Sequence, residues 1–207
     1  MVEDAQKLVC PLSSKRAFRV LCGCDGLVLV IVSDILSDSR PMHLLWNPST
    51  RESVVLPTPE FQIVDFTRYR MGYDSTSGDY KILKICNEKY DCNVHDEIIA
   101  LKGSSRRKID KHPLGVCNAM TRTSALAFVH EAFHWIGSSR NYSLLSFSIS
   151  NEVYGEVPLP EQILSFAGNI FLGVSVLDGM LCVHSVTFRE RFEICKLWVL
   201  KDYGFEW

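Results

Sequence analysis

The fold can be inferred from the segment Trp46-Asn47-Pro48-Ser49-Thr50-Arg51-Glu52, which leads on to Leu56-Pro57. A degenerate copy begins 101 residues later without a gap, as Phe147-Ser148-Ile149-Ser150-Asn151-Glu152 leading on to Val157-Pro158. Two further positions continue the series, Ile99 between the copies and Trp198 after them, so that successive members are 53, 48 and 51 residues apart. A period near fifty residues predicts several copies of one supersecondary unit packed side by side.

The segments around these positions have the pattern of β-strands separated by turns. The turn signals include Asn47-Pro48 and Asp178-Gly179. The second of these, Asp-Gly, is typical of two-residue hairpins. Strands are predicted at residues 27–32, 42–46, 53–56, 69–73, 80–85, 98–101, 126–129, 133–136, 142–149, 154–157, 174–177, 180–184 and 192–200. A fifty-residue period filled with strands is typical of kelch-type propeller blades. We therefore predict an all-β fold, a partial or open kelch-like β-propeller with about four blade repeats. The large side chains at the repeated position (Trp46, Phe147 and Trp198) are expected to pack between blades and not to bind a ligand.

The composition is that of an ordinary globular protein. Apolar residues make up 47% and charged residues 22% of 207 residues, and the formal net charge is -2. This charge provides no electrostatic reason to expect nucleic acid or an anionic membrane as a partner. The longest clean apolar run near the N-terminus, residues 27–32, is too short for a secretory signal or a membrane span. The eight cysteines are therefore interpreted as free thiols, and the protein as intracellular, cytoplasmic or nuclear.

Several segments resemble, in order, the motifs of the plant F-box-associated domain (type 1), a family of F-box/kelch-repeat-like substrate receptors. Besides the Trp46 stretch, they are Cys24-Asp25-Gly26-Leu27, Gly72-Tyr73-Asp74, Ala132-Phe133-His134-Trp135 and Trp198-Val199-Leu200-Lys201. The matches run from about residue 22 to the end of the chain. The resemblance implies a non-catalytic protein-interaction module that selects the target of a Skp–cullin–F-box ubiquitin ligase, while a helical F-box holds the Skp adaptor.

The chain is expected to divide into residues 1–20, an N-terminal extension without a recognisable F-box, and residues 21–207, the propeller domain. The expected partner is an unidentified target protein. The Skp–cullin complex is a partner only if a longer gene product supplies the F-box. The alternative is a truncated F-box-associated protein without a ligase role, a decoy or an inactive product. Its unmatched strand edges would favour dimerisation or aggregation.

A third and weakest interpretation is a zinc hydrolase, because His130-Glu131-Ala132-Phe133-His134 is a literal H-E-x-x-H motif. The motif binds zinc when a helix places both histidines on one face. Here the pattern predicts a turn at residues 130–131 followed by a strand, along which residues four apart are separated by about 13 Å. We therefore predict no catalytic, cofactor-binding or metal-binding residue.

The remaining polar and thiol groups are interpreted as structural. Cys22 and Cys24, like Cys86 and Cys92, are expected to be small apolar residues. One basic cluster combines Arg106, Arg107 and Lys108 with Lys102, Lys111 and His112. We interpret it as a solvated hairpin tip and not as a nucleic-acid site. The sequence singles out no partner-binding residue.

Overall fold

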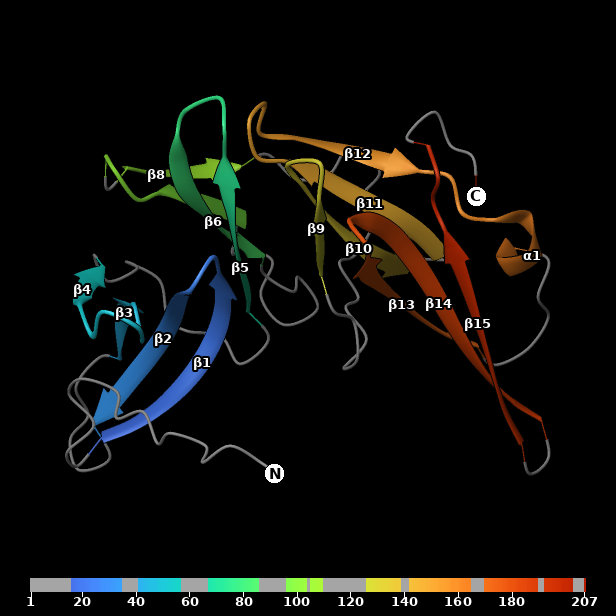
Figure 1. The fold of residues 1–207 in the computed structure, drawn as a ribbon, viewed down its shortest axis with the longest axis horizontal. Helices are drawn as coiled ribbons and strands as arrows, with labels where there is room; N and C mark the ends of the chain where they lie inside the picture. Colours follow the sequence, from blue (N-terminus) through green and yellow to red (C-terminus); the bar gives the residue numbers. More distant parts are fainter. Residues whose placement is uncertain are drawn as a thin grey trace.

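The computed structural model describes residues 16–34, 41–56, 67–85, 96–103, 105–109, 126–138, 142–164, 170–189, 192–202 and 207. These residues form four antiparallel sheets that follow one another along the chain and lie in a row (Figure 1). The first sheet contains β1 (Arg16–Cys24), β2 (Leu27–Asp34), β3 (Met42–Trp46) and β4 (Ser53–Leu56). The second contains β5 (Arg68–Asp74), β6 (Asp79–Ile85), β7 (Asp96–Ala100) and β8 (Ser105–Ile109).

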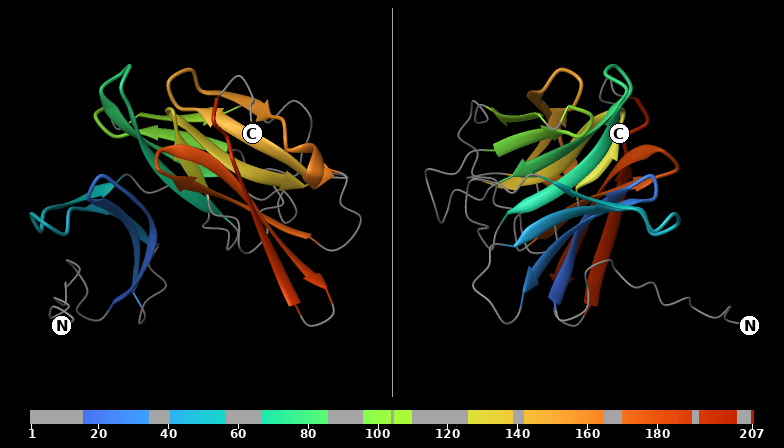
Figure 2. Two further views of the ribbon diagram at one scale, coloured as in Figure 1. Left: turned by 45° about the vertical axis from the view of Figure 1, so that its right-hand side comes forward. Right: turned by 90° about the vertical axis from the view of Figure 1, so that its left-hand side faces the viewer.

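The third sheet contains β9 (Ala127–Val129), β10 (Ala132–Ser138), β11 (Tyr142–Ser148) and β12 (Val153–Val157). A one-turn helix, α1 (Glu161–Leu164), leads to the fourth sheet, which contains β13 (Ile170–Leu177), β14 (Met180–Arg189) and β15 (Phe192–Val199). The first and fourth sheets stand at opposite ends of the row, so the propeller is open (Figure 2). The predicted fold class, an all-β partial propeller, is confirmed. Within the described part of the chain, no helix has the length and hydropathy needed to span a membrane.

The fifty-residue repeat corresponds to the third strand of each sheet. Trp46 is the last residue of β3, and Ile99, Phe147 and Trp198 are the penultimate residues of β7, β11 and β15. Each is paired with a large apolar residue of the second strand, in order Val28, Ile82, Phe133 and Val183. The repeat read from the sequence is therefore a structural repeat as well.

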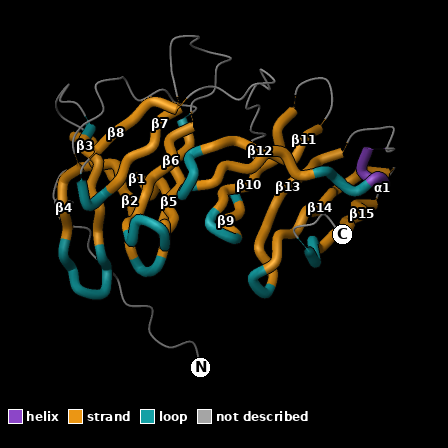
Figure 3. The backbone as a smooth tube through the Cα atoms, turned by 90° about the horizontal axis from the view of Figure 1, so that it is seen from above, coloured by secondary structure: helices purple, strands orange, loops and turns teal. Residues whose placement is uncertain are grey.

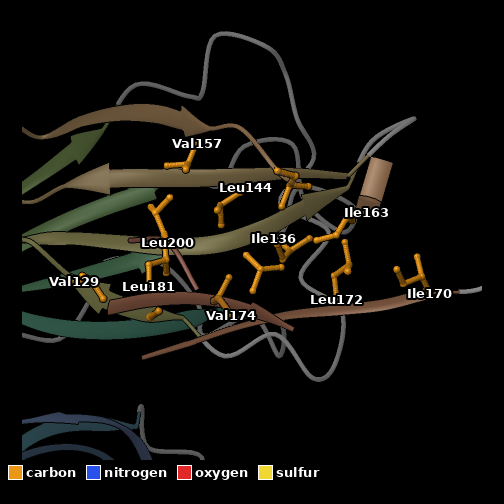
Figure 4. Packing of buried hydrophobic residues seen from close by; sticks show 13 residues of the cluster. Val129, Ile136, Leu144, Val157, Ile163, Ile170, Leu172, Val174, Leu181 and Leu200 are labelled. Atoms are coloured by element: carbon orange, nitrogen blue, oxygen red, sulfur yellow. The ribbon is translucent and has the colours of Figure 1, made fainter. Parts of the chain in front are cut away.

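Apolar clusters join each sheet to the next. Ile99 belongs to a cluster shared by the first two sheets, and Phe147 to one shared by the second and third. Trp198 packs against the cluster between the third and fourth sheets. This cluster includes Leu144, Leu172 and Leu181 (Figure 4). Trp46 belongs to a cluster made by its own sheet, with Val30, Val32 and Leu44. Alternation along each strand explains this arrangement, because one face contacts the preceding sheet and the other the following one.

Candidate interaction surface

The tight turns of the first three sheets come together at one end of the molecule, here called the turn face. In an antiparallel four-stranded sheet, the turn after the first strand and the turn after the third lie at the same end. These turns are at residues 25–26, 47–52, 74–79, 101–103, 130–131 and 149–152 (Figure 3). Hydrogen bonds connect neighbouring sheets here: Tyr80 Oη donates to Asp25 Oδ2 at 3.1 Å, and Ser75 N donates to Glu131 Oε1 at 3.3 Å.

The two long copies of the repeat form the same turn. Arg51 N donates to Asn47 O at 2.8 Å, and Glu152 N donates to Ser148 O at 2.9 Å. Arg51 and Glu152 both have left-handed backbones, with φ of 64° and 57°. The side chain of the first turn residue also accepts hydrogen bonds, since Asn47 Oδ1 is 3.0 Å from Ser49 N. The correspondence across 101 positions thus extends to the backbone.

The H-E-x-x-H segment is not helical. His130 and Glu131 form the two-residue turn between β9 and β10, with φ of 49° and 56°, where the first and fourth sheets use Asp25-Gly26 and Asp178-Gly179. His134 lies in β10, fully buried, and is paired with Ala127 and Ser146. The first histidine is in a turn and the second inside a sheet, so the arrangement that a zinc hydrolase needs is not formed. The described residues contain no group of three potential metal ligands.

Glu131 instead joins two turns of the turn face. Its carboxylate accepts a hydrogen bond from Ser75 N and lies 3.0 Å from Ser150 Oγ, whose proton is shared with Asp74 Oδ1 at 2.8 Å. These hydrogen bonds lower the pKa of Glu131. A left-handed backbone conformation costs free energy at a non-glycine residue such as Glu131, and these hydrogen bonds offset that cost.

Lys81 is the centre of a charged network between the second and third sheets, here called the Lys81 network. Its Nζ atom lies 2.8 Å from Asp74 Oδ2 and 3.1 Å from Glu152 Oε1, and it donates to Ile149 O at 2.8 Å. The three protons of the ammonium group are therefore all used. Arg107 adds a second ion pair to Glu152. The Asp74 and Lys81 side chains are 1% and 8% exposed, so the ion pair is buried.

The network keeps both charges over a wide pH range. Burial opposes the charge of Asp74, but hydrogen bonds from Lys81, Ser77 and Ser150 outweigh it and lower the pKa of this carboxyl. Burial likewise opposes the charge of Lys81, while hydrogen bonds to Asp74 and Glu152 raise its pKa. The Asp74 contribution to stability is therefore lost only as the pH falls below the ordinary carboxyl range, and that of Lys81 only above the ordinary lysine range.

Two arginines of the basic cluster, Arg106 and Arg107, form ion pairs with different glutamates. Arg106 Nε lies 3.8 Å from Glu97 Oε2, which also pairs with Lys84 at 3.3 Å, whereas Arg107 pairs with Glu152. Arg106 and Arg107 thus point to opposite sides of the β8 strand, since neighbouring residues alternate. Lys111 and His112 lie outside the described residues. The sequence prediction did not foresee this pairing, because Glu97 lies in β7 and Glu152 in the turn at residues 149–152, both outside the basic segment.

The sequence was compared with known protein families and proteins. The model of the F-box associated beta propeller domain matches residues 2–206. This chain belongs to that family. An F-box/kelch-repeat protein of Arabidopsis thaliana is 23% identical over 198 residues, covering 93% of this chain and 51% of the relative. The F-box protein CPR1 of Arabidopsis thaliana is 24% identical over 195 residues, covering 82% of this chain and 46% of the relative. This chain spans about half the length of these relatives.

The described cysteines of this F-box-associated domain are free thiols: Cys22, Cys24, Cys182 and Cys195. Burial raises the pKa of Cys22 to about 12 and that of Cys24 to about 11. Thiols with such pKa values are not reactive nucleophiles at neutral pH. For Cys22 and Cys24 this agrees with the predicted role as small apolar residues. Cys86, Cys92, Cys10 and Cys117 lie outside the described residues.

Two buried histidines should make the F-box-associated domain sensitive to mild acid. Burial lowers the pKa of His43 to about 4, assisted by the nearby Arg106 and Lys84, and burial also lowers that of His134 to about 4. Each must therefore stay neutral in the folded protein, whereas the unfolded chain binds a proton near pH 6.5. The free energy of unfolding therefore has its full value above that pH and decreases below it, by on the order of 2 kcal/mol per histidine at pH 5.

The measurement is the melting temperature by circular dichroism at pH 8, 6.5 and 5. Asp74 does not titrate in this window, because its pKa is lowered from 3.8. A melting temperature that is the same at pH 8 and pH 5 would contradict the prediction.

Proposed function

We propose that this F-box-associated domain is the target-binding module of a Skp–cullin–F-box ubiquitin-ligase substrate receptor. The observation that carries the proposal is the family match over residues 2–206. It is supported by relatives that are F-box proteins by name. In this proposal the domain itself catalyses no reaction. Its role is to hold a target protein while a separate F-box attaches it to the Skp adaptor and the cullin.

The turn face is suited to binding a protein. Turns held on a rigid scaffold are common binding surfaces, and here hydrogen bonds and ion pairs connect turns of different sheets. A surface fixed in this way loses little conformational entropy when a partner binds. We place the module inside the cell, in the cytoplasm or nucleus, where its free thiols stay reduced.

The experiment compares the chain with a version carrying a fused F-box, using affinity capture from plant extract. We expect the Skp adaptor to be recovered only with the fusion, and the same target proteins to be recovered with both. In a reconstituted reaction, those targets should receive ubiquitin only when the fusion is present. An F-box fused to an unrelated domain is the control.

Two results would contradict the proposal. One is strong recovery of the Skp adaptor by the unfused chain, and the other is a set of captured proteins no different from that of the control. The alternative without a ligase role predicts targets that are captured by both versions but receive no ubiquitin with either.

A further inference from the structure

All acidic side chains in the turns of the turn face have a partner within the domain. The six residues, each with its hydrogen-bond donor or ion-pair partner, are Asp25 (Tyr80), Glu52 (Thr50), Asp74 (Ser77 and Lys81), Asp79 (the backbone N–H of Lys102), Glu131 (Ser75 and Ser150) and Glu152 (Lys81 and Arg107). Asp79 is engaged through both oxygens, which lie 3.0 and 3.1 Å from Lys102 N. The carboxylates of this face are therefore engaged by groups of the domain itself.

The same turns contain two lysine or arginine side chains, Arg51 and Lys102, and both are exposed. Within the described ranges, neither side chain takes part in an ion pair. Since the carboxylates of the turn face are already engaged, these positive charges are available to an acidic group of another molecule. Electrostatic complementarity therefore favours an acidic partner on this face, although the chain as a whole has a net charge of -2.

Beside Lys102 lies a second hydrogen-bond donor, the hydroxyl group of Tyr73. A β-carbon at Gly78 would lie 3.5 Å from Lys102 Nζ and 3.8 Å from Tyr73 Oη. The two donor atoms therefore both lie close to Gly78, which has a φ of 63° and no side chain to occupy the space beside them. No described residue forms a hydrogen bond with Tyr73 Oη. A carboxylate with its two oxygens matches this pair of donors, an ammonium group and a hydroxyl group.

The Tyr73 ring provides an exposed apolar surface next to these donors. Tyr73 is 40% exposed, and its ring centroid lies 5.0 Å from that of Tyr80. Tyr80 is itself held in place, because its Oη atom donates a hydrogen bond to Asp25 of the first sheet. The Tyr73 ring is thus supported by a neighbouring ring while part of its surface stays open to solvent. Rigid aromatic side chains of this kind are frequent anchors in protein interfaces.

We propose that Lys102 and Tyr73 together bind a carboxylate side chain of the target protein. The ammonium group of Lys102 and the hydroxyl group of Tyr73 each donate a hydrogen bond to the carboxylate. An apolar side chain next to that carboxylate in the target packs on the Tyr73 ring. The bound segment is therefore acidic and contains an aromatic or aliphatic residue. This inference rests on the proposed function and states which chemistry of the target the turn face selects.

The experiment titrates the full chain with three synthetic pentapeptides and follows its backbone amide signals by NMR. The first peptide is Gly-Glu-Trp-Glu-Gly with blocked termini, and in the other two peptides glutamine or lysine replaces both glutamates. We expect the acidic peptide to shift the amide signals of Gly78 and Lys102, with a dissociation constant on the order of 1 mM. The glutamine peptide should bind about five- to tenfold more weakly, and the lysine peptide more weakly still.

Variants test whether the selectivity belongs to this site. Lys102→Glu should reverse it, so that the lysine peptide binds best, and Lys102→Gln should remove most of the difference between the peptides. Tyr73→Phe keeps the ring but removes the hydroxyl group, and it should weaken binding of the acidic peptide about threefold. The control is Lys196→Glu, a charge change at an exposed lysine of the fourth sheet, which should leave all three affinities unchanged. Circular dichroism shows whether each variant is folded.

The proposal is overturned if the acidic peptide leaves the Gly78 and Lys102 signals unchanged, or if the glutamine peptide binds equally well. It is also overturned if Lys196→Glu has the same effect as Lys102→Glu, because binding would then follow the net charge of the chain. Failure of this site can be separated from failure of the proposed function, since the capture experiment with the fused F-box does not depend on the peptides. Targets recovered equally well with Lys102→Glu would leave the proposed function intact and exclude Lys102 as the carboxylate-binding residue.

Discussion

Replacing Lys81 by methionine should lower the free energy of unfolding by about 3–5 kcal/mol. The substitution preserves the length and apolar stem of the side chain but removes the ammonium group. Asp74 is then left buried at 1% exposure without its ion pair, and Ile149 O loses a hydrogen bond. Glu152 still has Arg107. The uncompensated Asp74 charge is therefore the main cause of the loss, measured by urea unfolding followed with circular dichroism.

A double variant distinguishes the effect of the unpaired charge on stability from the effect of changed packing. In Asp74→Asn with Lys81→Met, neither residue carries a charge, so much of the lost stability should return. In the single variant the pKa of Asp74 should rise, because the hydrogen bond from Lys81 that lowers it is gone. Its destabilisation should then decrease at acid pH, where the carboxyl takes up a proton. Equal destabilisation in the single and double variants would argue against this role of Lys81.

Phe147→Ala should cost about 3–5 kcal/mol, because it leaves a cavity between the second and third sheets. Phe147 is fully buried, lies opposite Phe133, and contacts the Tyr154 ring at 4.9 Å between centroids. Trp198 occupies the equivalent position but is only partly buried. Trp198→Ala should therefore cost less than Phe147→Ala, although the sequence alone suggests equal roles for the two residues.

Thermal unfolding of the two alanine variants measures this difference. Phe147→Leu is the matched control, because it keeps most of the apolar volume and should cost clearly less than alanine. The expected order of destabilisation is Phe147→Ala first, then Trp198→Ala. The reverse order would show that the fourth sheet, and not the centre of the row, limits stability.

The sequence predicted most strands because their signals are local. Residues 27–32, 42–46 and 80–85 lie within β2, β3 and β6 of the structure. The β8 strand was missed and interpreted as a polar hairpin tip, because Arg106, Arg107 and Lys108 conceal the alternation that marks a half-buried strand. The short α1 helix was missed as well, since four residues are too few for a helical period.

Features of the candidate surface could be predicted only where the residues that form them are close together in the sequence. The turn at residues 130–131 was foreseen, because it is flanked by two apolar runs. The Lys81 network was not foreseen, since Lys81 and Glu152 are 71 residues apart and neither carries a local signal. That the fourth sheet has three strands among the described residues could not be predicted either, because this is visible only when the four sheets are compared.

The repeat near fifty residues, the positions of most strands and the family could be predicted from the sequence alone, because they depend on periodic patterns and motifs of neighbouring residues. The pairing of charges and the full burial of Phe147 among the repeated large side chains became visible only in the folded structure. Burial and ion pairing depend on which sheets come into contact, and no local pattern of residues records that contact. Equivalent positions such as Trp46, Phe147 and Trp198 have similar sequence surroundings but different neighbours in space.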